Sequence, residues 1–276
     1  MALLLPVTAD CNLRCVFCSA VDRRDRSAPH FLLRRIAQDA SGHVQISGGE
    51  PLLLPPLELE RILSACRRRG KIVELQTNGT LLAAVADKHF QRLLGLVSFF
   101  NVNFPAPAAA TDEKTCGIKG AFAARLAGVR RLLEHRAQVR LTYVVCRQNL
   151  RSLRHFALFV SRELSGVRWL QFSFVKALGR GAGNRRVVPT FQEAAAPLNA
   201  TLARCRELRL RFEIDHIPQC FVPEYRRWHA DRLKMQARLR GPHLLEKRRL
   251  PSCRGCAYSP DCPGPRQDYV ALYGGL

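Results

Sequence analysis

The sequence lacks the long apolar runs and the N-terminal pattern that membrane and secreted proteins carry. Its most apolar region, residues 93–110, is interrupted by three polar residues and two prolines. Residues 1–9 have no basic start and only a short apolar run. Short-period repeats and low-complexity segments are also missing, so a repeat architecture is not expected. These absences predict a soluble, globular protein of the cytoplasm.

Acidic residues are scarce. The chain has 22 Asp and Glu against 44 Lys and Arg, which gives a formal net charge of +22 and a pI near 10.5. Such a surface suits an acidic partner: nucleic acid, an acidic peptide, or an acidic electron carrier such as a flavodoxin or ferredoxin. The basic residues are overwhelmingly arginine and are scattered along the chain, which biased coding also explains. The charge by itself therefore does not choose a partner.

Eleven cysteines are present, and seven of them fall into two groups with ligand-like spacing. An odd number of cysteines in a chain without a secretion signal favours metal sites over disulfides. The first group is Cys11, Cys15 and Cys18, on one short loop after the strand-like run 3–8. Three thiolates leave one iron of a 4Fe–4S cube without a protein ligand. Zinc would need a fourth residue nearby, and none follows Cys18 for a long way.

Strand-like and helix-like stretches alternate along most of the chain. The predicted strands are 3–8, 43–47, 71–76, 96–103, 138–145 and 167–175, and the long predicted helices are 57–69, 81–94, 122–133, 153–164 and 191–205. This order predicts βα units around a parallel sheet, in which the chemistry gathers at the carboxyl ends of the strands. The cysteine loop, Gly48-Gly49-Glu50 and Thr77-Asn78-Gly79 all follow predicted strands.

Two motifs together resemble the signature of the radical S-adenosylmethionine (radical SAM) superfamily: Cys11-x3-Cys15-x-Phe-Cys18, and Gly48-Gly-Glu-Pro51 after the second predicted strand. The resemblance implies a partial (β/α)6 barrel and a 4Fe–4S cluster coordinated by three cysteines and exchangeable SAM. It also implies reductive cleavage of SAM to a 5′-deoxyadenosyl radical, which abstracts a substrate hydrogen. The protein then holds the geometry and excludes water.

The same resemblance implies where SAM binds. Gly48 and Gly49 would let the backbone approach the methionyl end of SAM, and the Glu50 carboxylate would accept from the SAM ammonium group. The glycine run 179–183 resembles the loop after the sixth strand in this family and is expected to shape the barrel mouth. A phosphate-binding loop is not expected there, because no Gly-Lys-Ser/Thr follows the run.

Three polar residues at strand ends are further candidates for contacts with SAM. Related enzymes often carry a serine followed by Asp-Gly after the fourth strand. Asn103 stands there in this chain as a candidate donor to the SAM carboxylate. Asn78 and Ser173, at the ends of the third and sixth strands, are similar candidates. Turn-forming and strand-lining roles explain these residues as well.

A second cysteine group lies past residue 207, where the alternation changes. Its members are Cys220, Cys253, Cys256 and Cys262. By spacing alone, four thiolates suit structural zinc and a fully ligated 4Fe–4S cluster equally. The last three resemble the core of SPASM and twitch extensions, which implies one auxiliary 4Fe–4S cluster, with zinc as the alternative. The full SPASM pattern has a further cysteine where this chain has Arg266. We therefore predict a core barrel over residues 1–207 and a twitch-like extension over residues 208–276.

Four cysteines remain outside these groups. Cys66 and Cys205 fall on apolar helix faces and are expected in the core. Cys116 and Cys146 follow the fourth and fifth strands. Either of them is a candidate to return a hydrogen atom to a substrate radical, as in epimerase-type relatives.

The function expected from the resemblance is radical SAM chemistry in the maturation of a ribosomal peptide or protein side chain. The alternative is a small molecule or nucleotide precursor in cofactor or natural-product biosynthesis. Because the chain begins at the first predicted strand, we expect either a separate leader-peptide recognition protein or direct binding of an acidic leader. A zinc-binding nucleic-acid protein is a remote alternative, since it explains neither the first cysteine loop nor Gly48–Glu50.

Overall fold

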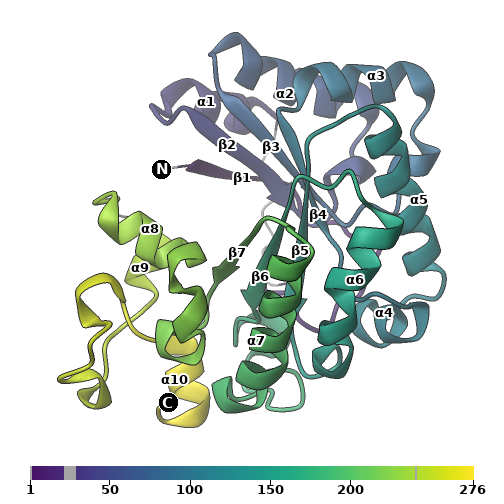
Figure 1. Ribbon diagram of the computed structural model, residues 1–276. Helices are drawn as coiled ribbons and strands as arrows, with labels where there is room; N and C mark the ends of the chain where they lie inside the picture. The colour runs from purple at the N-terminus through teal and green to yellow at the C-terminus, as the bar shows by residue number, and fades with distance from the viewer. Residues whose placement is uncertain (1, 22–28, 240) are drawn as a thin grey trace.

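A computed structural model describes residues 2–21, 29–239 and 241–276. The centre is a parallel sheet of seven strands in the order β1 to β7, with β1 and β7 at its two edges (Figure 1). The strands are β1 (Ala2–Thr8), β2 (His43–Gly48), β3 (Ile72–Thr77), β4 (Phe99–Asn103), β5 (Val139–Val145), β6 (Trp169–Phe174) and β7 (Phe212–Asp215). The predicted α/β class with a parallel sheet is confirmed.

Helices connect successive strands and also form the C-terminal part of the chain (Figure 1). They are α1 (Pro29–Gln38), α2 (Pro56–Arg68), α3 (Asp87–Leu96), α4 (Ala109–Cys116), α5 (Ala121–Glu134), α6 (Leu153–Glu163), α7 (Phe191–Glu207), α8 (Ala230–Gln236), α9 (Pro242–Leu245) and α10 (Gln267–Tyr273). None of the described helices has the length and hydrophobicity to cross a membrane.

The two faces of the sheet differ in chemistry. Paired residues of a parallel sheet share a face, and one such row is apolar and 0–1 % exposed: Ile46, Leu75, Phe100 and Val139. The next row points to the opposite face and is mostly polar: Gln76, Asn101, Arg140 and Trp169. Parallel sheets are usually apolar on both faces. In this sheet only the first face follows that rule, because the second row is polar apart from Trp169.

The apolar face packs against amphipathic helices. In α2, the buried side chains are Leu59, Ile62, Leu63 and Cys66, whose spacing places them on one face of the helix. The predicted helix 81–94 is wrong in its first half, because the chain forms one 3-10 turn at Leu82–Ala84 and α3 begins only at Asp87. Arg131 of α5 explains the break, since its guanidinium donates to the carbonyls of residues 82, 83 and 85.

The sheet continues past the predicted boundary at residue 207. β7 pairs with β6 in parallel, with Ser173 opposite Asp215. The helices that follow β7 lie beside that edge of the sheet (Figure 1). They are anchored there by aromatic packing, because the Tyr269 ring stacks on Phe191 of α7 at a centroid distance of 3.6 Å. The sheet therefore contains strands from both sides of residue 207. The division into two domains at that residue stays a prediction.

Candidate functional site

The cysteine loop follows β1 and is fastened to the end of α4. The backbone N–H of Arg14 donates to the carbonyl of Cys116 at 2.9 Å, and that of Val16 donates to Thr115 at 2.9 Å. Gly117, with φ of 72°, ends α4 in the left-handed conformation that glycine adopts readily. The carbonyls of Thr115 and Cys116, the last two of the helix, are thus paired with N–H groups of the loop.

The three cysteines of this loop follow the carboxyl end of β1. Cys11 is exposed, Cys15 and Cys18 are half-buried, and the charges of Cys18 and Glu50 both act on Cys11. Burial is the main cause that raises the pKa of the Cys11 thiol. The thiol of Cys15 is hydrogen-bonded with Cys116, which raises the pKa of Cys15.

No three His, Cys, Asp or Glu side chains within the described ranges converge closely enough to hold a single metal ion. The chemistry of the donor set is nonetheless that of a cubane with one open iron, because three thiols lie on one short loop, so the residues present fit an iron–sulfur cluster.

Gly48 and Gly49 pack against the residues that lead into the cysteine loop. A Cβ on Gly48 would lie 2.2 Å from the carbonyl oxygen of Thr8, and a Cβ on Gly49 would lie 2.0 Å from that of Asp10. The N–H of Gly49 donates to Thr8 and the N–H of Glu50 to Asp10, each at 2.7 Å. The close approach that requires these glycines is thus to the protein's own backbone.

Glu50 lies beneath the site, fully buried. One carboxylate oxygen accepts from the Thr77 hydroxyl at 2.7 Å and from the N–H of Leu52 at 3.1 Å, and the other accepts from the N–H of Asn78 at 2.7 Å. Burial raises the pKa of this carboxyl, and the three hydrogen bonds oppose that shift. The side chain is 0 % exposed and its hydrogen bonds join β2 to β3, while its contact with the SAM ammonium stays a prediction.

Asn78 is placed next to the cysteine loop, as its position after the third strand predicts. Its side-chain amide donates to Asn12 at 2.8 Å and lies 4.0 Å from the sulfur of Cys11. Asn103 and Ser173 are half-buried and lie near the carboxyl ends of β4 and β6, on the polar inner face of the sheet. The amide of Asn103 donates to the carbonyl of Thr142 at 3.4 Å. Asn78 is the candidate that directly contacts the loop.

The glycine run after β6 also contacts the loop. A Cβ on Gly179 would lie 2.4 Å from the carbonyl oxygen of Cys18. The N–H of Arg180 donates to that carbonyl at 3.0 Å, and its guanidinium donates to the carbonyl of Cys15 at 3.2 Å. These contacts agree with the predicted role of the run in shaping the barrel mouth.

Cys116 and Cys146 are both 0 % exposed. Cys116 packs against Cys15 and Leu13, and burial raises the pKa of Cys146 to about 12. Neither thiol has accessible surface in this structure, and the hydrogen-donor role of either one stays a prediction. Cys66 and Cys205 are buried in the core as predicted.

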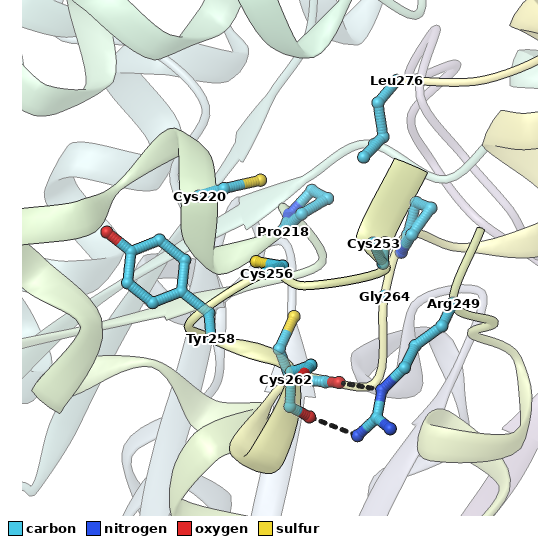
Figure 2. A pocket seen from close by; sticks show the side chains of 11 residues that line it. Pro218, Cys220, Arg249, Cys253, Cys256, Tyr258, Cys262, Gly264 and Leu276 are labelled. Carbon is cyan, nitrogen blue, oxygen red and sulfur yellow. Dashed lines mark hydrogen bonds between the residues drawn. The ribbon is translucent and has the colours of Figure 1, made fainter. Parts of the chain in front are cut away.

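The second cysteine group converges from segments that are far apart in the sequence. Cys220, Cys253, Cys256 and Cys262 line one small pocket in the C-terminal extension (Figure 2). Burial, with smaller contributions from the charges of the other three, raises the pKa of Cys220 to about 11. Arg249 closes one side by donating to the carbonyls of Cys262 and Ser259, as Figure 2 shows for Cys262.

Sequence reasoning did not single out Arg125 and Asp112, which lie directly under the first loop. Both are 0 % exposed and form an ion pair with each other. A signal was present for Arg125, because it lies four residues after Ala121 and four before Val129, on the buried stripe of α5. A charged residue on an apolar stripe needs a buried partner, so the position of Arg125 was the signal in the sequence for a buried ion pair.

Comparison with known proteins places the fold and the loop in one family. The family model described as the Radical SAM superfamily matches residues 5–160. The PqqA peptide cyclase of Gluconobacter oxydans is 29% identical over 243 residues, which is 85% of this chain and 63% of that protein. The AdoMet-dependent heme synthase of Methanosarcina barkeri is 31% identical over 197 residues, 68% of this chain and 54% of that protein.

Among solved structures, Streptococcus suis SuiB bound to S-adenosylmethionine aligns with a TM-score of 0.63 at 16% identity, covering 77% of this chain and 50% of SuiB. At that identity the likeness concerns the fold alone. The chain spans between half and two thirds of the length of the curated relatives named above, 54% and 63%. The match of the family model over more than half of the chain is the decisive finding. The chain belongs to the radical SAM superfamily, and membership implies a 4Fe–4S cluster and SAM.

Proposed function

We propose that the protein is a radical SAM enzyme that modifies a peptide. Its first cluster would be held by Cys11, Cys15 and Cys18, with SAM at the remaining iron. The observation that carries this proposal is that the cysteine loop, Gly48–Glu50 and Asn78 are packed together at the carboxyl ends of β1, β2 and β3. Such convergence positions a site on rigid elements instead of on a free loop.

The cluster and SAM, when bound, supply an organic radical that removes a hydrogen atom from the substrate. The chain's own residues supply geometry. Glu50 fixes the backbone of β2 against β3 through hydrogen bonds to Leu52, Thr77 and Asn78. Asn78 then places its amide between Asn12 and the sulfur of Cys11.

We assign the C-terminal cysteines to one auxiliary 4Fe–4S cluster. Four thiols line one pocket, and the resemblance of the last three to the core of SPASM and twitch extensions favours a cluster over zinc. With four protein ligands this cluster has no open iron. Electron relay and formation of one wall of the active site are its proposed roles. Arg266, at the position of a further SPASM cysteine, is buried and ion-paired with Glu246 and Asp268, so it serves as a structural anchor there.

The peptide substrate is supported by the name of the PqqA peptide cyclase and by SuiB, which has been solved bound to the precursor peptide SuiA. The alternative, a small-molecule precursor, is supported by the AdoMet-dependent heme synthase. On the basis of the net charge of +22, an acidic electron donor such as a flavodoxin or ferredoxin remains a proposed partner, and direct binding of an acidic leader remains proposed. A separate leader-recognition protein is the other proposed route to the peptide.

Iron analysis tests both cluster assignments. After anaerobic reconstitution we expect about eight irons per chain, falling to about four in Cys256→Ala and in Cys15→Ala. Cys205→Ala is the control, because this cysteine is buried in the core and its loss should leave the iron content unchanged. One zinc with about four irons would contradict the auxiliary cluster, and zinc alone would contradict both assignments.

The activity is tested by anaerobic incubation of the reconstituted protein with SAM and a reductant. We expect 5′-deoxyadenosine in the wild type and in Cys205→Ala, and none in Cys15→Ala. Adding candidate precursor peptides from neighbouring genes should increase its formation and change the peptide mass. Stimulation by a porphyrin precursor instead of any peptide would favour the alternative.

A further inference from the structure

Arg125 is the largest fully buried side chain of the described residues, and it lies directly behind the cysteine loop. It belongs to α5, where its neighbours on the buried stripe are small or apolar. Burying a guanidinium is costly unless its donors find partners. The identity of those partners therefore shows what the residue is for.

Each part of the guanidinium has its own partner. Nε donates to the main-chain carbonyl of Asn78 at 2.8 Å, Nη1 is ion-paired with Asp112, and Nη2 donates to the sulfur of Cys116 at 3.3 Å. The guanidinium carbon also lies 5.7 Å from the centre of the Phe104 ring. Only a planar fork with donors in several directions satisfies all these groups together, which a lysine cannot do.

Every hydrogen-bonded partner of Arg125 contacts the cysteine loop itself or belongs to a helix that does. Asn78 reaches Asn12 and the sulfur of Cys11 through its side chain. Asp112 and Cys116 belong to α4, whose last two carbonyls accept from the backbone of Arg14 and Val16. The loop is thus held from two sides, by the end of β3 and by the end of α4, and Arg125 joins these two supports.

We propose that Arg125 is the positioning residue that sets the geometry of the cysteine loop for cluster binding. This rests on the proposed function, since it assumes that the loop holds a cluster. The link acts through Asn78 on the side of Cys11 and through α4 on the side of Cys15. Loss of the Arg125 guanidinium should make the cysteine loop more mobile while the sheet remains folded.

Three variants test this. Arg125→Lys keeps the positive charge but removes the planar guanidinium with its several donors. Arg125→Met combined with Asp112→Asn removes the ion pair without leaving a buried, unpaired carboxylate. Arg140→Met is the matched control, because Arg140 is also buried and ion-paired, with Glu74, but has no hydrogen bond to the loop.

The first measurement is amide hydrogen exchange of the metal-free protein under anaerobic conditions. In the wild type, the amides of Arg14 and Val16 should be protected like those of the sheet. In both Arg125 variants, the amides of residues 11–18 should exchange at least about tenfold faster, and in Arg140→Met they should not. Wild-type amides of Arg14 and Val16 that exchange at the rate of an open loop would overturn the proposal, even if no variant folds.

The second measurement is iron content with the electron paramagnetic resonance spectrum of the reduced protein. In both Arg125 variants, iron should fall from about eight towards about four per chain, with loss of the signal that responds to SAM. The signal of the auxiliary cluster should persist. Unchanged exchange and an unchanged SAM-responsive signal in both variants would overturn the proposal. A wild type that binds no iron would refute the proposed function and with it the link to cluster binding. The exchange measurement would still show separately whether Arg125 holds the loop.

Discussion

Gly49→Ala tests whether the cysteine loop depends on the close approach of two backbone segments. The added Cβ would lie 2.0 Å from the carbonyl oxygen of Asp10, where ordinary contacts begin at 3.4 Å. The segments must therefore separate by about 1.4 Å, and no rotamer change can relieve the clash because the opposing atoms are backbone.

The cost follows from the hydrogen bonds that cross this contact. Two of them, from Gly49 to Thr8 and from Glu50 to Asp10, are each 2.7 Å long. Each contributes about 1 kcal/mol net, so Gly49→Ala should lower the free energy of unfolding by about 2 kcal/mol. Because Asp10 precedes Cys11 directly, iron incorporation into the first cluster should fall as well.

Urea unfolding of the metal-free protein, followed by circular dichroism, measures this effect. Gly95→Ala is the control, because Gly95 lies in α3 with nothing within 4 Å of the added Cβ. That substitution should raise stability by about 0.5–1 kcal/mol, as alanine favours helix. If Gly49→Ala unfolds at the wild-type urea concentration and binds the wild-type amount of iron, the close packing described for this contact is refuted.

Two further predictions concern ion pairs. Lys247→Met should lower the free energy of unfolding in urea by about 3–5 kcal/mol, because it leaves the buried carboxylates of Asp231 and Asp215 without their shared cation. A decrease below about 1 kcal/mol would contradict this. Hydrogen bonds from Arg147 hold the pKa of Glu193 at about 2, below its usual 4.5. Since the folded-state pKa is lowered, the contribution of Glu193 is present above pH 4.5 and lost as pH falls towards 2. The stability difference between wild type and Glu193→Gln should disappear over that interval, and a difference that persists at pH 2 would refute the ion pair.

The polar inner face of the sheet was visible in the sequence only in part. Alternation in strands such as 138–145 predicted strands, but the pairing of Gln76 with Asn101 and of Asn101 with Arg140 depends on register. Register is decided by how helices pack on the apolar face, so residues on neighbouring strands cannot be aligned from sequence alone. The same reason explains the broken helix 81–94, whose interruption depends on Arg131 from a distant helix.

The sequence alone determined the family and the parallel α/β class, and it singled out both cysteine groups. It could do so because the cysteines of the first group lie on one loop, within eight residues, and because strands and helices leave local periodic patterns. The tertiary structure decided which residues are buried and which distant segments are in contact. It buried Glu50 and the thiols of Cys116 and Cys146, and it brought Cys220 into one pocket with three cysteines more than thirty residues away. It also set Arg125 behind the cysteine loop, since burial and hydrogen bonding between distant residues arise only when the chain has folded.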